Sequence, residues 1–192
     1  MFDGRTTTCL REGAVVLHVE LPAQFQPMVH TVNLFQPGSG PTIQFAQPGF
    51  AASRATVDGR PVEFAAYLRK AAADASLPLV ADYAGTNVNV SIKSIDDETG
   101  KVSFYAPVFP GIDYHLAEPV ANYAEAFARQ VPKNARPLLS CNCILNYLFG
   151  RLEGKRTAPF VGPITFGEIA HQLLNQTLVY LAHRDPAADG GS

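Results

Sequence analysis

NVNVSIKSIDDETGKVSFYAPV, residues 87–108, is the stretch that most clearly predicts the fold. Apolar and polar side chains alternate along Asn87–Ile95, and the alternation resumes along Val102–Val108. A polar turn, Asp96–Gly100, separates the two runs. Alternation with a period of two is typical of strands that bury one face. Two such runs around a turn therefore predict an antiparallel hairpin with an acidic, exposed tip.

Outward from this hairpin, the sequence predicts two amphipathic helices and several short elements. Apolar residues recur at spacings of three and four along Glu63–Ala75 and along Pro119–Val131. Asp58-Gly59 is typical of a hairpin turn. Further predicted elements are a short helix at Cys143–Phe149, a helical turn at Ile169–Leu174 and a final strand at Thr177–His183.

Strands in hairpins, with helices following runs of strands, predict an α+β fold: a mainly antiparallel sheet with helices packed on it. The chain has 192 residues, of which 47% are hydrophobic and 17% charged. That composition supports a buried core and excludes a disordered chain. We expect a single domain over residues 1–192, with strands and the first helix in residues 1–75 and a flexible polar tail at 184–192.

Charge and cysteine content narrow the class of protein. The formal net charge is -2, which argues against a protein that binds nucleic acid over its whole surface. The sequence contains neither an apolar run long enough for a membrane helix nor a signal-peptide core, so we expect no membrane partner. The three cysteines, Cys9, Cys141 and Cys143, have no framework spacing. Reduced thiols and a cytoplasmic location are the expectation.

Common cofactor and metal motifs do not occur. Gly38-Ser39-Gly40 is followed by proline instead of the helix start that a dinucleotide fingerprint needs. Gly154-Lys155 is followed by Arg156, which breaks the phosphate-loop pattern. One Cys-x-Cys pair supplies only half of the ligands of a structural zinc site. The sequence predicts no cofactor and no metal.

The segment 160–170, FVGPITFGEIA, is the most unusual part of the chain. Gly162 allows a close backbone approach, and Thr165 and Glu168 lie among apolar residues. A carboxylate in such surroundings is costly to bury unless it is paired or faces a cleft. Polar groups also stand beside apolar runs at Asn142, a candidate N-cap, and at Asn175 and Thr177. These groups are candidates to line a pocket.

Two further features each have two interpretations. Cys141 is either a packing residue or a nucleophile with His115 or His171 as its base. Six basic residues cluster late in the chain with a single acid, Glu153, between them. The cluster either attracts an anionic ligand or partner, or forms solvated loops beside a short helix. Its members are Arg129, Lys133, Arg136, Arg151, Lys155 and Arg156.

Three segments, Ser140-Cys141-Asn142, Phe160–Ile169 and Asn175-Gln-Thr177, together resemble the C-terminal half of FIST sensory domains. The similarity lies within residues 79–183. The chain departs from that pattern where Asn142-Cys143 replaces Gly-Arg and where Leu174 replaces histidine. The resemblance implies intracellular sensing of a small, amino-acid-like ligand and no established catalytic residue. It implies these pocket residues: Cys141, Asn142, Gly162, Thr165, Glu168, Asn175 and Thr177.

The sequence thus favours a cytoplasmic module that binds or senses a small polar molecule, and it favours a binding protein over an enzyme. In this hypothesis Glu168 meets a ligand amine, while neighbouring amides and hydroxyls supply neutral hydrogen bonds. An enzyme with Cys141 as nucleophile is one alternative. An interaction scaffold that adds the strands of Asn87–Val108 to a partner is another. The favoured hypothesis also allows for a homodimer.

Overall fold

The protein was analysed as a computed structural model, which describes residues 2–9, 11–12, 16, 18–132 and 136–184. The chain divides into two compact units, Met1–Pro27 with Arg184–Ser192, and Met28–His183. The described part of the first unit contains a short hairpin, β1 (Phe2–Asp3) and β2 (Thr8–Cys9). Most of the predicted tail, residues 185–192, lies outside the described residues.

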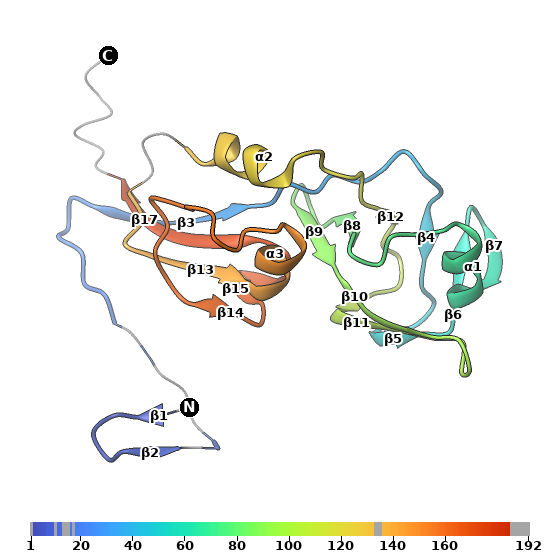
Figure 1. The fold of residues 1–192 in the computed structure, drawn as a ribbon, viewed down its shortest axis with the longest axis horizontal. Coiled ribbons are helices and arrows are strands. Elements are labelled where there is room, and N and C mark those ends of the chain that lie inside the picture. Colours follow the sequence, from blue (N-terminus) through green and yellow to red (C-terminus); the bar gives the residue numbers. More distant parts are fainter. Residues whose placement is uncertain (1, 10, 13–15, 17, 133–135, 185–192) are drawn as a thin grey trace. The chain divides into compact units, whose positions relative to one another are not determined.

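Two antiparallel sheets surround the first core of the second unit (Figure 1). The six-stranded sheet has the order β7 (Arg60–Glu63), β6 (Arg54–Val57), β4 (Ile43–Gln44), β12 (Tyr114–Leu116), β8 (Leu79–Asp82) and β9 (Asn87–Val90). The three-stranded sheet has the order β10 (Ile92–Asp96), β11 (Lys101–Val108) and β5 (Gly49–Ala52). The predicted turn at Asp58-Gly59 is confirmed: both residues have positive φ, as a type I′ turn requires.

An aromatic core joins these sheets to helix α1 (Phe64–Lys70). We define the aromatic core as Phe45, Phe64, Phe104 and Tyr114, each no more than 4% exposed. The Phe45 ring meets the other three edge-on, with ring centroids 5.3 to 5.7 Å apart. Edge-on contacts suit the quadrupoles of aromatic rings. The predicted helix is therefore present, but it ends at Lys70, shortly before Ala72 adopts a left-handed conformation.

The predicted hairpin is confirmed at its turn, where Asp96 pairs with Lys101. Its first strand is not continuous, because it divides at Ser91 between the six-stranded and three-stranded sheets. The Ser91 N–H donates to the side-chain oxygen of Asn175, 3.0 Å away. A side chain from a distant segment thus takes the hydrogen bond that a neighbouring strand would otherwise accept.

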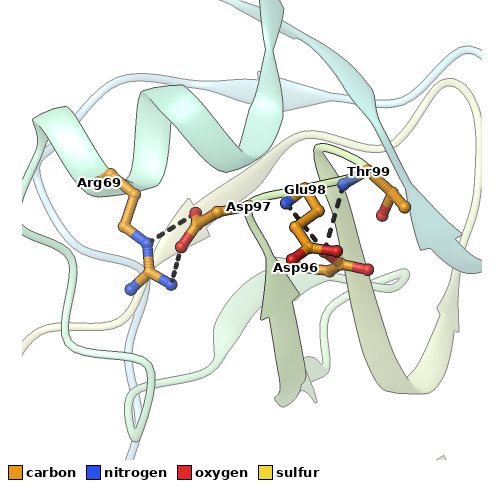
Figure 2. A network of polar contacts seen from close by, with 5 residues as sticks. All are labelled: Arg69, Asp96, Asp97, Glu98 and Thr99. Carbon is orange, nitrogen blue, oxygen red and sulfur yellow. Dashed lines mark hydrogen bonds and ion pairs between the residues drawn. The ribbon is translucent and has the colours of Figure 1, made fainter.

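The acidic tip of this hairpin is exposed, as predicted, and it is tied to α1 (Figure 2). The Arg69 guanidinium donates two hydrogen bonds to the Asp97 carboxylate, at 3.0 and 2.9 Å. Asp96 accepts hydrogen bonds from the backbone N–H groups of Glu98 and Thr99, which close the turn. Local hydrogen bonding therefore orders a segment that the sequence alone predicts only as a polar turn.

A third sheet, of four strands, carries the C-terminal part of the fold (Figure 1). Its order is β14 (Ile164–Thr165), β13 (Leu139–Cys143), β17 (Leu178–Arg184) and β3 (Gln26–Val32). The pair β13–β14 is parallel and the pair β13–β17 is antiparallel. Helix α2 (Tyr123–Gln130) packs Phe127 against Leu178 and Tyr180 of this sheet, and α3 (Ile144–Phe149) follows β13 directly.

One predicted element is wrong. Ile169–Leu174, expected to form a helical turn, is a hairpin of β15 (Glu168–Ala170) and β16 (Gln172–Leu174). His171 adopts a left-handed φ of 67° at its turn, which reverses the chain where a helix would continue. The α+β class itself is confirmed, with mainly antiparallel sheets and short helices. Among the described residues, no helix combines the length and apolar character needed to cross a bilayer.

Candidate functional site

Two cavities lie close together within Met28–His183, and the larger of this pair has a volume of about 440 Å³. Its apolar wall includes Phe35, Leu77 and Val120, which pack together with Val80 and Ala117 of the six-stranded sheet region. Its polar wall consists of Asp74, Ser76, Asn122, Arg151 and Lys155. A concave space with an apolar wall and a few polar groups is the usual form of a small-molecule site.

Tyr123, the first residue of α2, lines this cavity and also packs against the apolar cluster around Phe127 and Leu178. The Tyr123 ring fits here because residue 150 is a glycine. A Cβ added to Gly150 would lie 2.6 Å from the Tyr123 ring, closer than Cβ atoms approach other atoms in proteins. The Tyr123 hydroxyl donates a short hydrogen bond to the side-chain oxygen of Asn146. Burial raises the pKa of Tyr123 well above its usual value, so the hydroxyl remains a donor.

The hydrogen bonds continue inward from Tyr123 to a predicted site residue. The Asn146 amide nitrogen donates to the Asn142 side-chain oxygen at 2.7 Å, and both residues are buried. Asn142 also lines the second cavity, of about 70 Å³, together with Gly162 and Lys155. Lys155 therefore lines both cavities, and the chain Tyr123–Asn146–Asn142 connects their walls.

Glu168, on β15, is the buried carboxylate that the sequence singles out, with 6% of its surface exposed. Its two oxygens accept hydrogen bonds from Thr177, at 3.1 Å, and from Thr165, at 3.4 Å. The Thr165 hydroxyl also lies 3.3 Å from the Asn142 backbone oxygen. Burial raises the pKa of Glu168 to about 7, although these hydroxyls and nearby backbone N–H groups favour the charged form.

The structure thus brings four predicted residues together: Asn142, Thr165, Glu168 and Thr177. None of the seven predicted residues lines the larger cavity, and only Asn142 and Gly162 line the smaller one. Gly162 lies so close to β13 that an added Cβ would be 1.8 Å from the Ser140 backbone oxygen. Its close approach is to the protein's own backbone.

Asn175 belongs to a separate group of buried or half-buried amides and hydroxyls, which we call the polar seam: Asn33, Asn89, Ser91, Asn175 and Gln176. Asn89 and Asn33 exchange two side-chain hydrogen bonds of 3.0 Å. Asn89 also donates to the Asn175 backbone oxygen at 3.1 Å. The Ser91 hydroxyl lies 2.6 Å from the Asn175 side-chain oxygen. These contacts join β9 to the segment before β17.

Several of these residues are not found by reasoning from the sequence. Asn89 and Ser91 occupy the polar side of an alternating strand, where exposure is the ordinary expectation, yet they are 0% and 1% exposed. Asn146 lies within the apolar pattern of α3 and carries no motif. The asparagine content of residues 87–89 and 142–146 is the one signal that could have directed attention to them.

The geometry also bears on the two cysteines. Cys141 is half-buried, and burial together with the nearby charge of Glu168 raises the pKa of its thiol. Cys143 is buried, and burial raises its pKa as well. A nucleophilic cysteine needs the opposite shift. His115 lies on β12 with Nδ1 3.1 Å from the Gly40 backbone oxygen, and His171 is at the β15–β16 turn.

The N-cap of α3 is Cys143, which makes no side-chain capping bond, so the expected capping role of Asn142 is wrong. The Asn142 side chain instead accepts from Asn146. Among the residues that the structure describes, no three histidines, cysteines or acids are grouped to hold a metal ion.

Comparison with known proteins places the chain in a family. The chain belongs to DUF6976, a family of unknown function, whose family model matches residues 1–184. No curated protein and no solved structure matches the chain.

Proposed function

We propose that this member of the DUF6976 family is a cytoplasmic module that binds and senses a small polar molecule in the larger cavity. One observation carries the proposal. A cavity of about 440 Å³ has Tyr123 in its wall, and Tyr123 is hydrogen-bonded through Asn146 to Asn142, one of the predicted pocket residues. A ligand contact at Tyr123 would therefore reach the buried polar groups directly.

The size and lining of the cavity support a small ligand. Sites for small molecules have volumes of about 300 to 1,000 Å³, with mostly apolar walls and a few placed polar groups. Here rings and aliphatic side chains form one wall, while Ser76 and Asn122 offer neutral hydrogen bonds. In this proposal Glu168, Thr165 and Thr177 stabilise the fold and do not contact the ligand. The Glu168 carboxylate already accepts hydrogen bonds from both threonine hydroxyls.

The resemblance to FIST sensory domains supports sensing and an amino-acid-like ligand. Acidic and basic side chains in the same cavity wall agree with a ligand that carries charge. A cytoplasmic location is supported by the three cysteines, Cys9, Cys141 and Cys143, which are all free thiols. The raised thiol pKa of Cys141 argues against the alternative in which this residue is a nucleophile.

Thermal shift against amino acids, small acids, amines and nucleotides tests the proposal. A ligand present at 100 times its dissociation constant stabilises the folded state by about 2.7 kcal/mol, which is readily measured. Val120→Trp fills the cavity and should abolish the shift. Val161→Trp is the matched control, because Val161 is 86% exposed and lines neither cavity. A flat panel on the folded protein, or an equal shift in both variants, would contradict the proposal.

A further inference from the structure

We infer that the ligand of the larger cavity is an organic anion, whose acidic group is held by Arg151 and Lys155 where the two cavities adjoin. The inference rests on the proposed function, because it assigns a chemical class to the ligand of that same cavity. It also gives a role to part of the basic cluster in the late chain. Among the members of that cluster that the structure describes, Arg151 and Lys155 line the larger cavity.

The wall of the larger cavity contains two basic side chains. Arg151 and Lys155 are exposed, and neither forms an ion pair among the described residues. By contrast, Arg54, Arg69 and Arg129 each have a carboxylate partner within 4 Å. A cation without a partner at the wall of a cavity is available to an anionic ligand.

The acids near this wall do not neutralise the two cations. Asp74 is the acidic residue that lines the cavity, and its Oδ1 accepts hydrogen bonds from the Ser76 backbone N–H at 2.9 Å and hydroxyl at 2.7 Å. These bonds lower the pKa of Asp74, so it carries one negative charge. Glu153, between the two cations in sequence, does not line the cavity. Two positive charges therefore stand against one negative charge in the wall.

Lys155 determines where the acidic group would lie, because it lines both cavities. Its backbone N–H donates to the Leu152 oxygen at 3.0 Å, and Leu152 is 1% exposed. The turn that carries Lys155 is thus anchored on a buried side chain. Beside it, the smaller cavity presents hydroxyls of Ser140 and Thr157 and the amide of Asn142. Neutral donors next to a cation suit a carboxylate or phosphate group.

The backbone at Arg151 provides a way to separate binding from folding. Arg151 has a φ of 51°, in the left-handed region that glycine adopts without cost. Replacing it by glycine removes the cation and relieves an unfavourable backbone conformation at the same position. Arg151→Gly should therefore weaken anion binding without lowering the melting temperature. If Arg151 only stabilised the fold, its replacement would lower the melting temperature.

Carboxylic acids paired with their own primary amides test the inference at low ionic strength and pH 7.5. Suitable pairs run from acetate and acetamide to succinate and succinamide and to phenylacetate and phenylacetamide. Thermal shift finds the best acid, and calorimetry measures its dissociation constant. We expect acids to bind and their amides to bind at least tenfold more weakly. Arg151→Gly and Lys155→Met should each weaken the acid at least tenfold, whereas the control Lys70→Met, on exposed α1 surface, should not.

The outcomes separate the two proposals. Amides that bind as well as acids would overturn the anion inference and leave small-molecule binding in place. Equal loss of acid binding in Lys70→Met would also overturn it, because net charge alone would then account for the effect. A panel in which only amines or zwitterions bind, with Arg151→Gly unchanged, overturns it too. If no member of any class binds, the proposed function fails, and this inference fails with it.

Discussion

The aromatic core and the polar seam are both buried, but they are built from opposite chemistry. In the core, Phe45 meets three other aromatic residues edge-on, and no hydrogen bond between side chains is needed to hold Phe64 or Phe104. In the seam, Asn89, Ser91 and Gln176 are at most 1% exposed, and each is held by hydrogen bonds. One region is built from hydrocarbon, the other from amides and hydroxyls that hydrogen-bond to one another.

The aromatic core and the polar seam differ in the interactions that stabilise them. Apolar burial is non-directional and scales with area, so a core side chain contributes through its size. A buried amide contributes little net stability while it is bonded, but leaving its partner without a bond is costly. The core should therefore respond to changes of volume. The seam should respond to the loss of single atoms. Glu168, which belongs to the other buried polar group, should respond to pH.

Phe64→Ala should have the largest effect on stability. Phe64 is completely buried, and its ring packs against Phe45 and Phe104. Truncating a buried phenylalanine costs about 3 to 5 kcal/mol, through lost transfer energy and the cavity left behind. Urea denaturation measures the loss. Phe50→Ala is the control, since Phe50 is 57% exposed, and a similar cost in both variants would show that this core does not hold the fold together.

Glu168 should make stability depend on pH. Its pKa in the folded protein is about 7, above the ordinary value of 4.5. As the pH rises, the unfolded chain therefore releases this proton at a lower pH than the folded protein does. The contribution of protonated Glu168 to the free energy of unfolding is thus full below pH 4.5 and is lost as the pH rises through about 7. At about 1.4 kcal/mol for each tenfold change in the ionisation constant, the loss is about 3 kcal/mol.

Glu168→Gln removes this ionisation and nearly keeps the shape of the side chain. Urea denaturation at pH 5 and at pH 8 should show the wild type losing stability relative to the variant at the higher pH. Glu118→Gln, a change at an exposed carboxylate, should follow the wild type at both values. Parallel curves for the wild type and Glu168→Gln would mean that Glu168 ionises in the folded state as freely as in the unfolded chain.

Asn175→Ala tests the polar seam and should have a smaller effect. The change leaves the Ser91 N–H without the oxygen to which it donates at 3.0 Å, whereas the Ser91 hydroxyl keeps the side-chain oxygen of Gln176 as a partner. An unsatisfied buried donor costs about 1 to 3 kcal/mol. Hydrogen exchange at the Ser91 amide should accelerate in parallel, because this bond is what divides the strand between two sheets. Protection that survives the substitution would assign the division to another cause.

The same two regions show how far the sequence predicts the structure. Alternation along 87–108 correctly predicts the hairpin, and spacing along 63–75 correctly predicts a helix, because apolar periodicity reports directly on a hydrocarbon core. The seam has no such periodicity. Whether Asn89 is exposed or buried depends on Asn33 and Asn175, which lie far away in sequence, and local pattern carries no information about them.

The candidate site divides in the same way. Glu168 and Thr177 are conspicuous in sequence because polar groups stand out among apolar neighbours, and the structure does bring them together. Tyr123 is inconspicuous, because an aromatic residue in a helix is ordinary, and Arg151 stands out only as one of six residues in the basic cluster. Their place beside one cavity results from the packing of loops that follow α1 and α3. Such packing has no signature in local sequence.

Arg69→Met should have the smallest effect, although its contact with Asp97 is the best-formed ion pair in the described part of the chain (Figure 2). The pair is bidentate, with distances of 3.0 and 2.9 Å, but the two side chains are 56% and 63% exposed. Water competes for both charges, so exposed pairs contribute only about 0.2 to 1 kcal/mol.

A double-mutant cycle of Arg69→Met and Asp97→Asn isolates the pair from the other roles of the two residues. We expect a coupling energy of up to about 1 kcal/mol at low ionic strength, decreasing in 1 M salt because salt screens exposed charges. A coupling above about 2 kcal/mol that persists in salt would mean that the hairpin tip is held against α1 more firmly than exposed charges allow. The turn bonds to Asp96 would remain in either case, because they are local to 96–99. The tip can therefore keep its shape after losing its tie to the helix, whereas the polar seam cannot lose Asn175 without leaving the Ser91 N–H without its acceptor.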